Sequence, residues 1–220
     1  MTSTKSFLCT VIVVALCAFG TGCASFKGNN LPEVGSFPGP ASDAERPSVA
    51  LAFSSETDMM ARRPHPERVR EQLEAEFVGV LRDSGYFSAI EKAEEGKDLG
   101  MKLHLVNSGN PAAFIPAFIT GLSLYTIPSW GTDRFTVVCN VRLLDGKQYE
   151  YTLEDSAMLV QWLPMIFALP FNLPTEVPVE VRKNIYKNLI IKMQEDGIIP
   201  PDRDAPKTSN LFITFEILHA

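Results

Sequence analysis

The segment from residue 135 to residue 153 limits more than any other how this chain can fold. Apolar side chains alternate with mostly polar ones in FTVVCNVRL, and the alternation resumes in QYEYTL after a Leu-Asp-Gly triplet. A period of two residues is typical of a strand with one buried face. The segment therefore predicts two antiparallel strands joined by a tight turn.

Two turns fit this hairpin, and they place different residues opposite each other. A two-residue Asp-Gly turn would put Gln148 opposite Leu143, and so set polar side chains against the apolar row. A three-residue loop over residues 144–146, with its glycine left-handed, instead puts Tyr149 opposite Val141. Because the buried face of a hairpin decides its register, we predict the three-residue loop and its bulge.

Helical and strand patterns occupy most of the remaining chain. Apolar stripes at helical spacing predict one helix from Pro66 to Gly85 and a second from about Pro178 to Asp196. Alternating segments predict further strands over residues 48–54, 86–90, 99–106 and 211–217. This order predicts an α+β domain, with a mostly antiparallel sheet and two main amphipathic helices packed on one face.

The N-terminus carries a targeting pattern. Lys5 is the only charged residue before residue 27, an apolar run extends from Phe7 to Phe19, and small residues follow. A basic start, an apolar run of this length and a small-residue exit are typical of a secretory signal peptide. The run is shorter than the roughly 20 apolar residues that span a membrane comfortably.

The exit of this run, Gly20-Thr21-Gly22-Cys23, resembles the lipobox of bacterial lipoproteins, with Gly20 at a place usually taken by Leu. The resemblance implies that residues 1–22 are a lipoprotein signal peptide removed by a dedicated peptidase. It also implies that Cys23 receives a diacylglyceryl group and often a further acyl chain such as palmitate. The alternatives are an ordinary cleaved signal with an incidental cysteine, or a buried N-terminal helix.

The residues after Cys23 bear on location. In lipoproteins of many Gram-negative bacteria, Asp directly after the lipidated cysteine resembles an inner-membrane retention signal, and this chain has Ala24 there. The resemblance thus implies the outer membrane, facing the periplasm. Residues 23–47 are rich in Gly, Pro, Ser and Asn, which predicts a flexible tether after the lipidated cysteine. A single domain is expected over residues 48–220.

Charge and cysteine usage exclude several kinds of partner. The chain has 20 Lys and Arg against 26 Asp and Glu, and removal of Lys5 changes its net charge from −6 to −7. Without a basic block, nucleic acid is not an expected partner, and membrane attachment has to come from acyl chains. If Cys23 is lipidated, Cys139 is the one remaining mature cysteine, and it is expected to be a small buried hydrophobic residue.

Motifs of catalytic and metal sites are missing from the sequence. It has no Gly-rich phosphate loop, no His-Glu pair at zinc spacing and no G-x-S-x-G elbow. Its histidines, His65, His104 and His219, lie far apart. We therefore expect a non-enzymatic protein with no catalytic residue, metal or cofactor.

Two segments that are almost free of charge allow two interpretations. The first apolar segment is residues 111–130 and the second is residues 157–171, and prolines interrupt both. Both could be core, one as a buried connection and the other as a helix under the sheet. Part of them could instead be an exposed contact surface for a partner or for the membrane interface, because a few aromatic anchors dominate binding surfaces. The candidate contact residues are Trp130, Trp162, Phe167 and Phe171.

These observations favour a membrane-anchored envelope lipoprotein that works as a protein-binding or assembly and transport accessory module. The order of strands and helices is loosely similar to accessory lipoproteins of envelope transport and assembly systems, which is a likeness of fold only. The alternative is a carrier of lipid or another hydrophobic ligand, which would need an apolar cavity.

Overall fold

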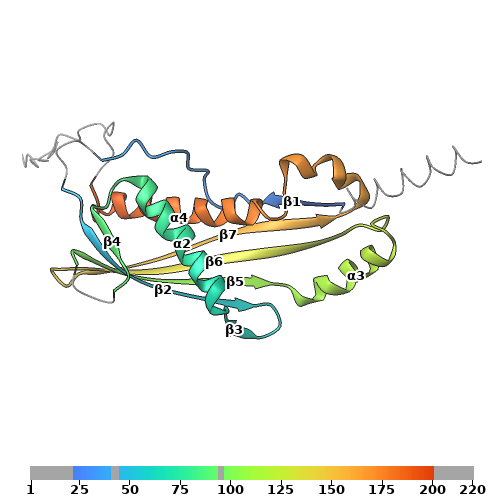
Figure 1. The fold of residues 1–220 in the computed structure, drawn as a ribbon, viewed down its shortest axis with the longest axis horizontal. Helices are drawn as coiled ribbons and strands as arrows, with labels where there is room; N and C mark the ends of the chain where they lie inside the picture. The colour runs from blue at the N-terminus through green and yellow to red at the C-terminus, as the bar shows by residue number, and fades with distance from the viewer. Residues whose placement is uncertain (1–21, 41–44, 94–96, 201–220) are drawn as a thin grey trace, which may run out of the picture.

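The computed structural model of the protein describes residues 22–40, 45–93 and 97–200. These residues form a seven-stranded sheet with the order β1-β7-β6-β5-β2-β3, and β4 pairs with β2 beside this path (Figure 1). The strands are β1 (Cys23–Lys27), β2 (Ser48–Asp58), β3 (Arg62–Pro64), β4 (Ala89–Glu91), β5 (Leu99–Gly109), β6 (Ser129–Leu143) and β7 (Gln148–Gln161). Only the pairs β2–β4 and β2–β5 are parallel, which confirms the α+β class and the mostly antiparallel sheet.

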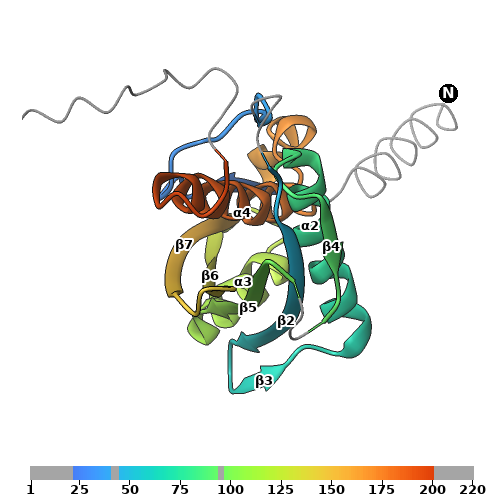
Figure 2. The ribbon, with the colours of Figure 1, turned by 90° about the vertical axis from the view of Figure 1, so that its left-hand side faces the viewer.

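Two long helices, α2 (Glu67–Ser84) and α4 (Val177–Glu195), pack on one face of the sheet, as predicted (Figure 2). α2 ends at Gly85, whose φ of 74° is the left-handed conformation that glycine adopts most readily. The shorter helical segments are η1 (Pro111–Ala113), α3 (Phe114–Leu122), η2 (Leu163–Phe167) and η3 (Leu169–Phe171).

The core lies between these two helices and the sheet. Phe77 of α2 and Tyr186 of α4 are fully buried, with ring centroids 5.0 Å apart. They meet the apolar face of the strands, to which Leu51, Leu103 and Val137 belong. The predicted stripes of both helices are therefore the faces that the fold buries, and each fully buried large side chain contributes about 1.5–3 kcal/mol.

The hairpin of β6 and β7 has the predicted register. Val141 pairs with Tyr149, and the Leu143 N–H donates to the Lys147 carbonyl (3.0 Å) across a three-residue loop. Gly146 has a φ of 85°, as the bulged loop requires. The hydrophobic face of the hairpin thus decides the register, and a two-residue turn does not form.

The prediction of a flexible tether over residues 23–47 is wrong at its start, residues 23–27. Residues 23–27 form β1, which pairs with β7 from Cys23 opposite Gln161 to Lys27 opposite Ala157. The folded domain therefore includes residues 23–27 and does not start at residue 48. The prediction failed because a five-residue strand is too short to show an alternation, and its partner residues lie 130 to 138 positions away in the sequence.

The chain after β1 is also held by long-range contacts. The Val34 N–H donates to Asn184 Oδ1 (2.9 Å), and Lys187 Nζ donates to the Val34 carbonyl (2.9 Å). The Phe37 ring lies edge-on to the Tyr86 ring, with centroids 5.6 Å apart. This irregular segment shows no helical or strand pattern in its sequence. Its position is fixed instead by contacts with helix α4 and with the core.

The remaining predicted elements have different outcomes. The strand expected over residues 99–106 is β5, and the short one expected over residues 86–90 corresponds to β4. The signal segment at residues 1–21 and the strand expected over residues 211–217 lie outside the described residues. Among the described residues, no helix is long and apolar enough to cross a membrane.

Candidate functional site

All four aromatic candidates for a contact surface are exposed. Trp130 is 65% exposed, Trp162 39%, Phe167 83% and Phe171 86%. The interpretation of the apolar segments as core is therefore wrong for these side chains. Trp130 belongs to the end of the first apolar segment, and the other three lie in or beside η2 and η3.

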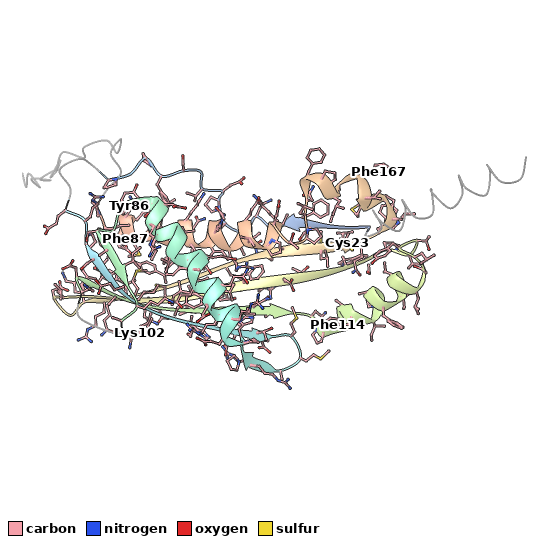
Figure 3. All side chains as sticks on the ribbon, in the orientation of Figure 1. Cys23, Tyr86, Phe87, Lys102, Phe114 and Phe167 are labelled. Atoms are coloured by element: carbon pink, nitrogen blue, oxygen red, sulfur yellow. The ribbon has the colours of Figure 1, made fainter. Side chains whose placement is uncertain are left out.

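Most of the exposed apolar side chains in the described residues gather at one end of the molecule. Apart from Met60, Val69 and Leu144, the exposed large hydrophobic residues all belong to residues 114–130 or 158–171. Besides the four aromatic candidates, they are Phe114, Ile115, Phe118, Ile119, Leu122, Leu124, Ile127, Met158 and Leu163. We call this set of residues the apolar end; Figure 3 shows Phe114 and Phe167 there, far from Lys102.

The hairpin explains why the two apolar segments meet. The first segment runs into β6 and the second follows β7, and an antiparallel hairpin places the start of one strand beside the end of the other. Ser129 accordingly pairs with Gln161, and the Leu163 N–H donates to the Tyr125 carbonyl (2.8 Å). The predicted register of the hairpin by itself implies that the two segments meet.

The first apolar segment turns its apolar side chains outward. Asn110 Oδ1 accepts a hydrogen bond from the Ala112 N–H (2.9 Å) and caps η1, which leads into α3. Within α3, Thr120 is the one buried residue. The loop that follows holds Leu124 and Tyr125 at φ values of 51° and 62°. This left-handed backbone costs about 1–3 kcal/mol at each non-glycine residue, a strain typical of functional loops.

The second apolar segment folds back along the free edge of β1. Its prolines stand at the starts of η2 and η3, where a missing backbone donor costs nothing. The Trp162 N–H donates to the Gly22 carbonyl (2.6 Å), which continues the β1–β7 pairing by one residue pair. On the other edge of β1, the Ser25 N–H donates to the Asn172 carbonyl (2.9 Å) and so occupies one position of the edge that β1 would otherwise leave open.

Cys23 lies where the two apolar segments meet, as Figure 3 shows between Phe114 and Phe167. It is buried as the first residue of β1. Burial raises the pKa of its thiol, and hydrogen bonds with Gln161 and Tyr125 act in the opposite direction. An acyl group attached to this sulfur would therefore start at the apolar end, with no linker before the fold.

The apolar end is also free of charge. Residues 105–132 and 156–175 contain no Asp, Glu, Lys or Arg. Along the hairpin, the first ionisable side chain of β6 is Asp133, which pairs with Ala157. Ala157 and Gln161 are four residue steps apart, which corresponds to about 13 Å of strand. Burial raises the pKa of Asp133. The hairpin thus carries a charge-free cap about 13 Å deep.

A separate cavity of about 200 Å³ lies between α2, α4 and the sheet. Its polar lining includes His65, Asn107 and the Glu76–Arg182 ion pair. The Arg182 guanidinium bonds Glu76 in a bidentate way (2.8 and 2.9 Å) and lies 5.3 Å from the centroid of Phe135. Apolar ligands prefer apolar walls, so this cavity does not match the one expected for a lipid carrier.

A row of polar side chains crosses the open face of the sheet. Ser54 Oγ lies 2.8 Å from His104 Nδ1, and His104 Nε2 lies 3.0 Å from Glu56 Oε1. Parallel pairing of β2 with β5 places Ser54 opposite His104, while Arg62 neutralises Glu56. In hydrolase triads the serine meets Nε2 and the carboxylate meets Nδ1. The row has the opposite arrangement, and we read it as cross-strand pairing.

No known family model matches this chain, and no curated protein matches it. Among solved structures, the chain is similar to a DUF4136 family protein from Bacteroides thetaiotaomicron, at 12% sequence identity. The similarity covers 74% of this chain and 98% of that chain, with a TM-score of 0.29.

Proposed function

We propose that this protein is a membrane-anchored lipoprotein of a bacterial envelope, held by acyl chains on Cys23. One observation carries the proposal: the cysteine of the lipobox-like sequence begins the folded domain and lies between two exposed, charge-free segments. Ala24 supports an outer-membrane location facing the periplasm. In this role the protein is a non-enzymatic binding module that assists an assembly or transport system.

The carrier alternative has less support. Ligand cavities typically measure about 300–1,000 Å³ and are mostly apolar. The cavity between α2 and α4 measures about 200 Å³ and has the Glu76–Arg182 pair in its wall. The apolar side chains that such a carrier would turn inward are instead exposed at the apolar end.

Acyl labelling in cells tests the anchor. The wild-type chain is expected to incorporate a labelled fatty acid and to lose residues 1–22, whereas Cys23→Ser should lose both labelling and processing. Cys139→Ser is the matched control, because Cys139 is fully buried in β6 and should not affect modification. Normal labelling of the Cys23→Ser protein would contradict the anchor.

Crosslinking in intact cells tests the binding role. A photo-crosslinking residue at Lys102, which is exposed on the open face of the sheet, should capture an envelope protein in reproducible stoichiometry. Mass spectrometry of the crosslinked product then identifies the partner. Crosslinks confined to abundant, unrelated proteins at this and other exposed positions would contradict a specific binding role.

A further inference from the structure

We infer that the apolar end docks end-on into the interface of a lipid bilayer, with the two apolar segments inserted on either side of the acylated Cys23. The inference rests on the proposed function for the anchor, and it names the membrane leaflet as the occupant of the apolar end. A protein partner is then bound by the remaining surface.

The position of Cys23 brings the membrane to this surface. Because β1 starts at Cys23 and pairs with β7 from that residue on, no flexible chain separates the acyl chains from the domain. The backbone bonds of Ser25 with Asn172 and of Leu163 with Tyr125 hold both apolar segments beside it. The leaflet that takes up the acyl chains must therefore lie against the apolar end.

The depth of the charge-free cap fits a bilayer interface. Apolar faces of interfacial segments enter the boundary between headgroups and acyl chains by about 5–10 Å. The hairpin has about 13 Å of strand before Asp133, so insertion to that depth buries no charge. Trp130 and Trp162 lie at this end, and tryptophan is enriched where an apolar phase meets water.

The composition of the apolar end distinguishes a membrane from a protein partner. Protein interfaces surround an apolar centre with a polar rim and are enriched in arginine. The two segments have no arginine and no other charged side chain, and the exposed face of α3 carries large apolar side chains, from Phe114 to Leu122. This uniformity suits lipid, which is apolar in every direction and offers no partner for a polar rim.

Binding to vesicles tests the inference without the acyl chains. The mature chain, residues 23–220, contains the whole described core and can be produced without its signal segment and without acylation. Its two tryptophans, Trp130 and Trp162, both lie at the apolar end. Adding phosphatidylethanolamine–phosphatidylglycerol vesicles should therefore shift the emission to the blue and bring the protein into the vesicle pellet. Phosphatidylcholine vesicles should give the same binding, because no basic residue contributes. Salt at about 0.5 M, which shortens the screening length to less than about 10 Å, should also leave binding unchanged.

Matched variants give the expected magnitudes. Phe167→Ser with Phe171→Ser, and separately Phe118→Ser with Leu122→Ser, should each weaken vesicle partitioning at least about tenfold, equivalent to about 1.4 kcal/mol. The control is Leu144→Ser, since this side chain is 77% exposed but lies in the β6–β7 turn, at the opposite end of the hairpin from Ser129 and Gln161. Control partitioning should equal wild type.

The outcomes separate the anchor from the docking surface. Normal acyl labelling, together with no blue shift and no pelleting of the mature chain, would overturn docking and leave the anchor intact. Labelling that persists in Cys23→Ser, with vesicle binding unchanged, would overturn the anchor and support docking. A large loss of thermal stability in the Phe167→Ser, Phe171→Ser variant would show these to be core residues and overturn docking. A photo-crosslinker at Phe167 that captures a protein, with no vesicle binding, would also overturn it.

Discussion

Ala24 is the residue at which the expected sorting signal and the fold coincide. Changing it to Asp is the direct way to test whether the residue after Cys23 directs the protein to the outer membrane. However, Ala24 is fully buried in β1 and pairs with Val160 of β7. We predict that Ala24→Asp unfolds more easily than wild type, whatever its effect on sorting.

The size of the effect follows from burial. Ala24→Asn places at this site a neutral amide with nearly the same shape as the Asp side chain. An unsatisfied buried polar group of this kind costs about 1–3 kcal/mol. In Ala24→Asp the carboxylate loses its hydration, and full burial raises a carboxyl pKa by up to about 3–5 units. A rise of about three units adds about 4 kcal/mol at pH 7, because each unit corresponds to about 1.4 kcal/mol.

Urea unfolding of the unacylated mature chain at several pH values measures this difference. The folded pKa of the new Asp lies above its unfolded value of about 3.9, so the extra penalty is absent below pH 4 and grows as the pH rises toward the folded pKa. Ala89→Asp is the control, since Ala89 is an exposed strand residue in β4, and we expect a change of about 0.5 kcal/mol or less. If Ala24→Asp and Ala24→Asn are equally stable at pH 7, or both lose less than about 1 kcal/mol, β1 is not part of the sheet in solution.

Four further predictions concern the fold. Gly146→Val should lose about 1–2 kcal/mol through left-handed strain alone, because a Cβ there meets nothing within 4 Å, and Gly146→Asn should lose less in the same urea titration. Burial raises the pKa of Cys139 to about 12, so with the other mature cysteine replaced by serine, alkylation near pH 8 should require unfolding; rapid reaction of the native protein would refute this. Arg182→Met should cost about 3–5 kcal/mol by leaving Glu76 unpaired between α2 and α4, and adding Glu76→Leu should restore most of the loss in thermal unfolding. Burial lowers the pKa of His65 below its ordinary value of 6.5, so stability should fall as the pH drops below 6.5, and His65→Gln should flatten that part of the profile.

Much of the fold could be read from local patterns. The stripes of α2 and α4, the left-handed Gly85 and the register that pairs Val141 with Tyr149 all depend on residues close in sequence. In each case the buried face has a period that the chain itself displays. The meeting of the two apolar segments was equally available, because they flank a hairpin whose register was predicted.

Tertiary structure alone decided the fate of residues 23–40 and the exposure of the apolar segments. β1 forms because β7 offers a free edge and because Asn172 accepts from Ser25 on the other side, and neither partner is near in sequence. Composition predicted a tether, since Gly, Pro and Asn carry no periodic signal. The sequence of the apolar segments fits either core or surface. Hydrophobicity disfavours contact of a side chain with water, but it does not determine whether another element of the fold packs over that side chain. Once α2 and α4 cover the helix-bearing face of the sheet, Phe167 and its neighbours remain outside.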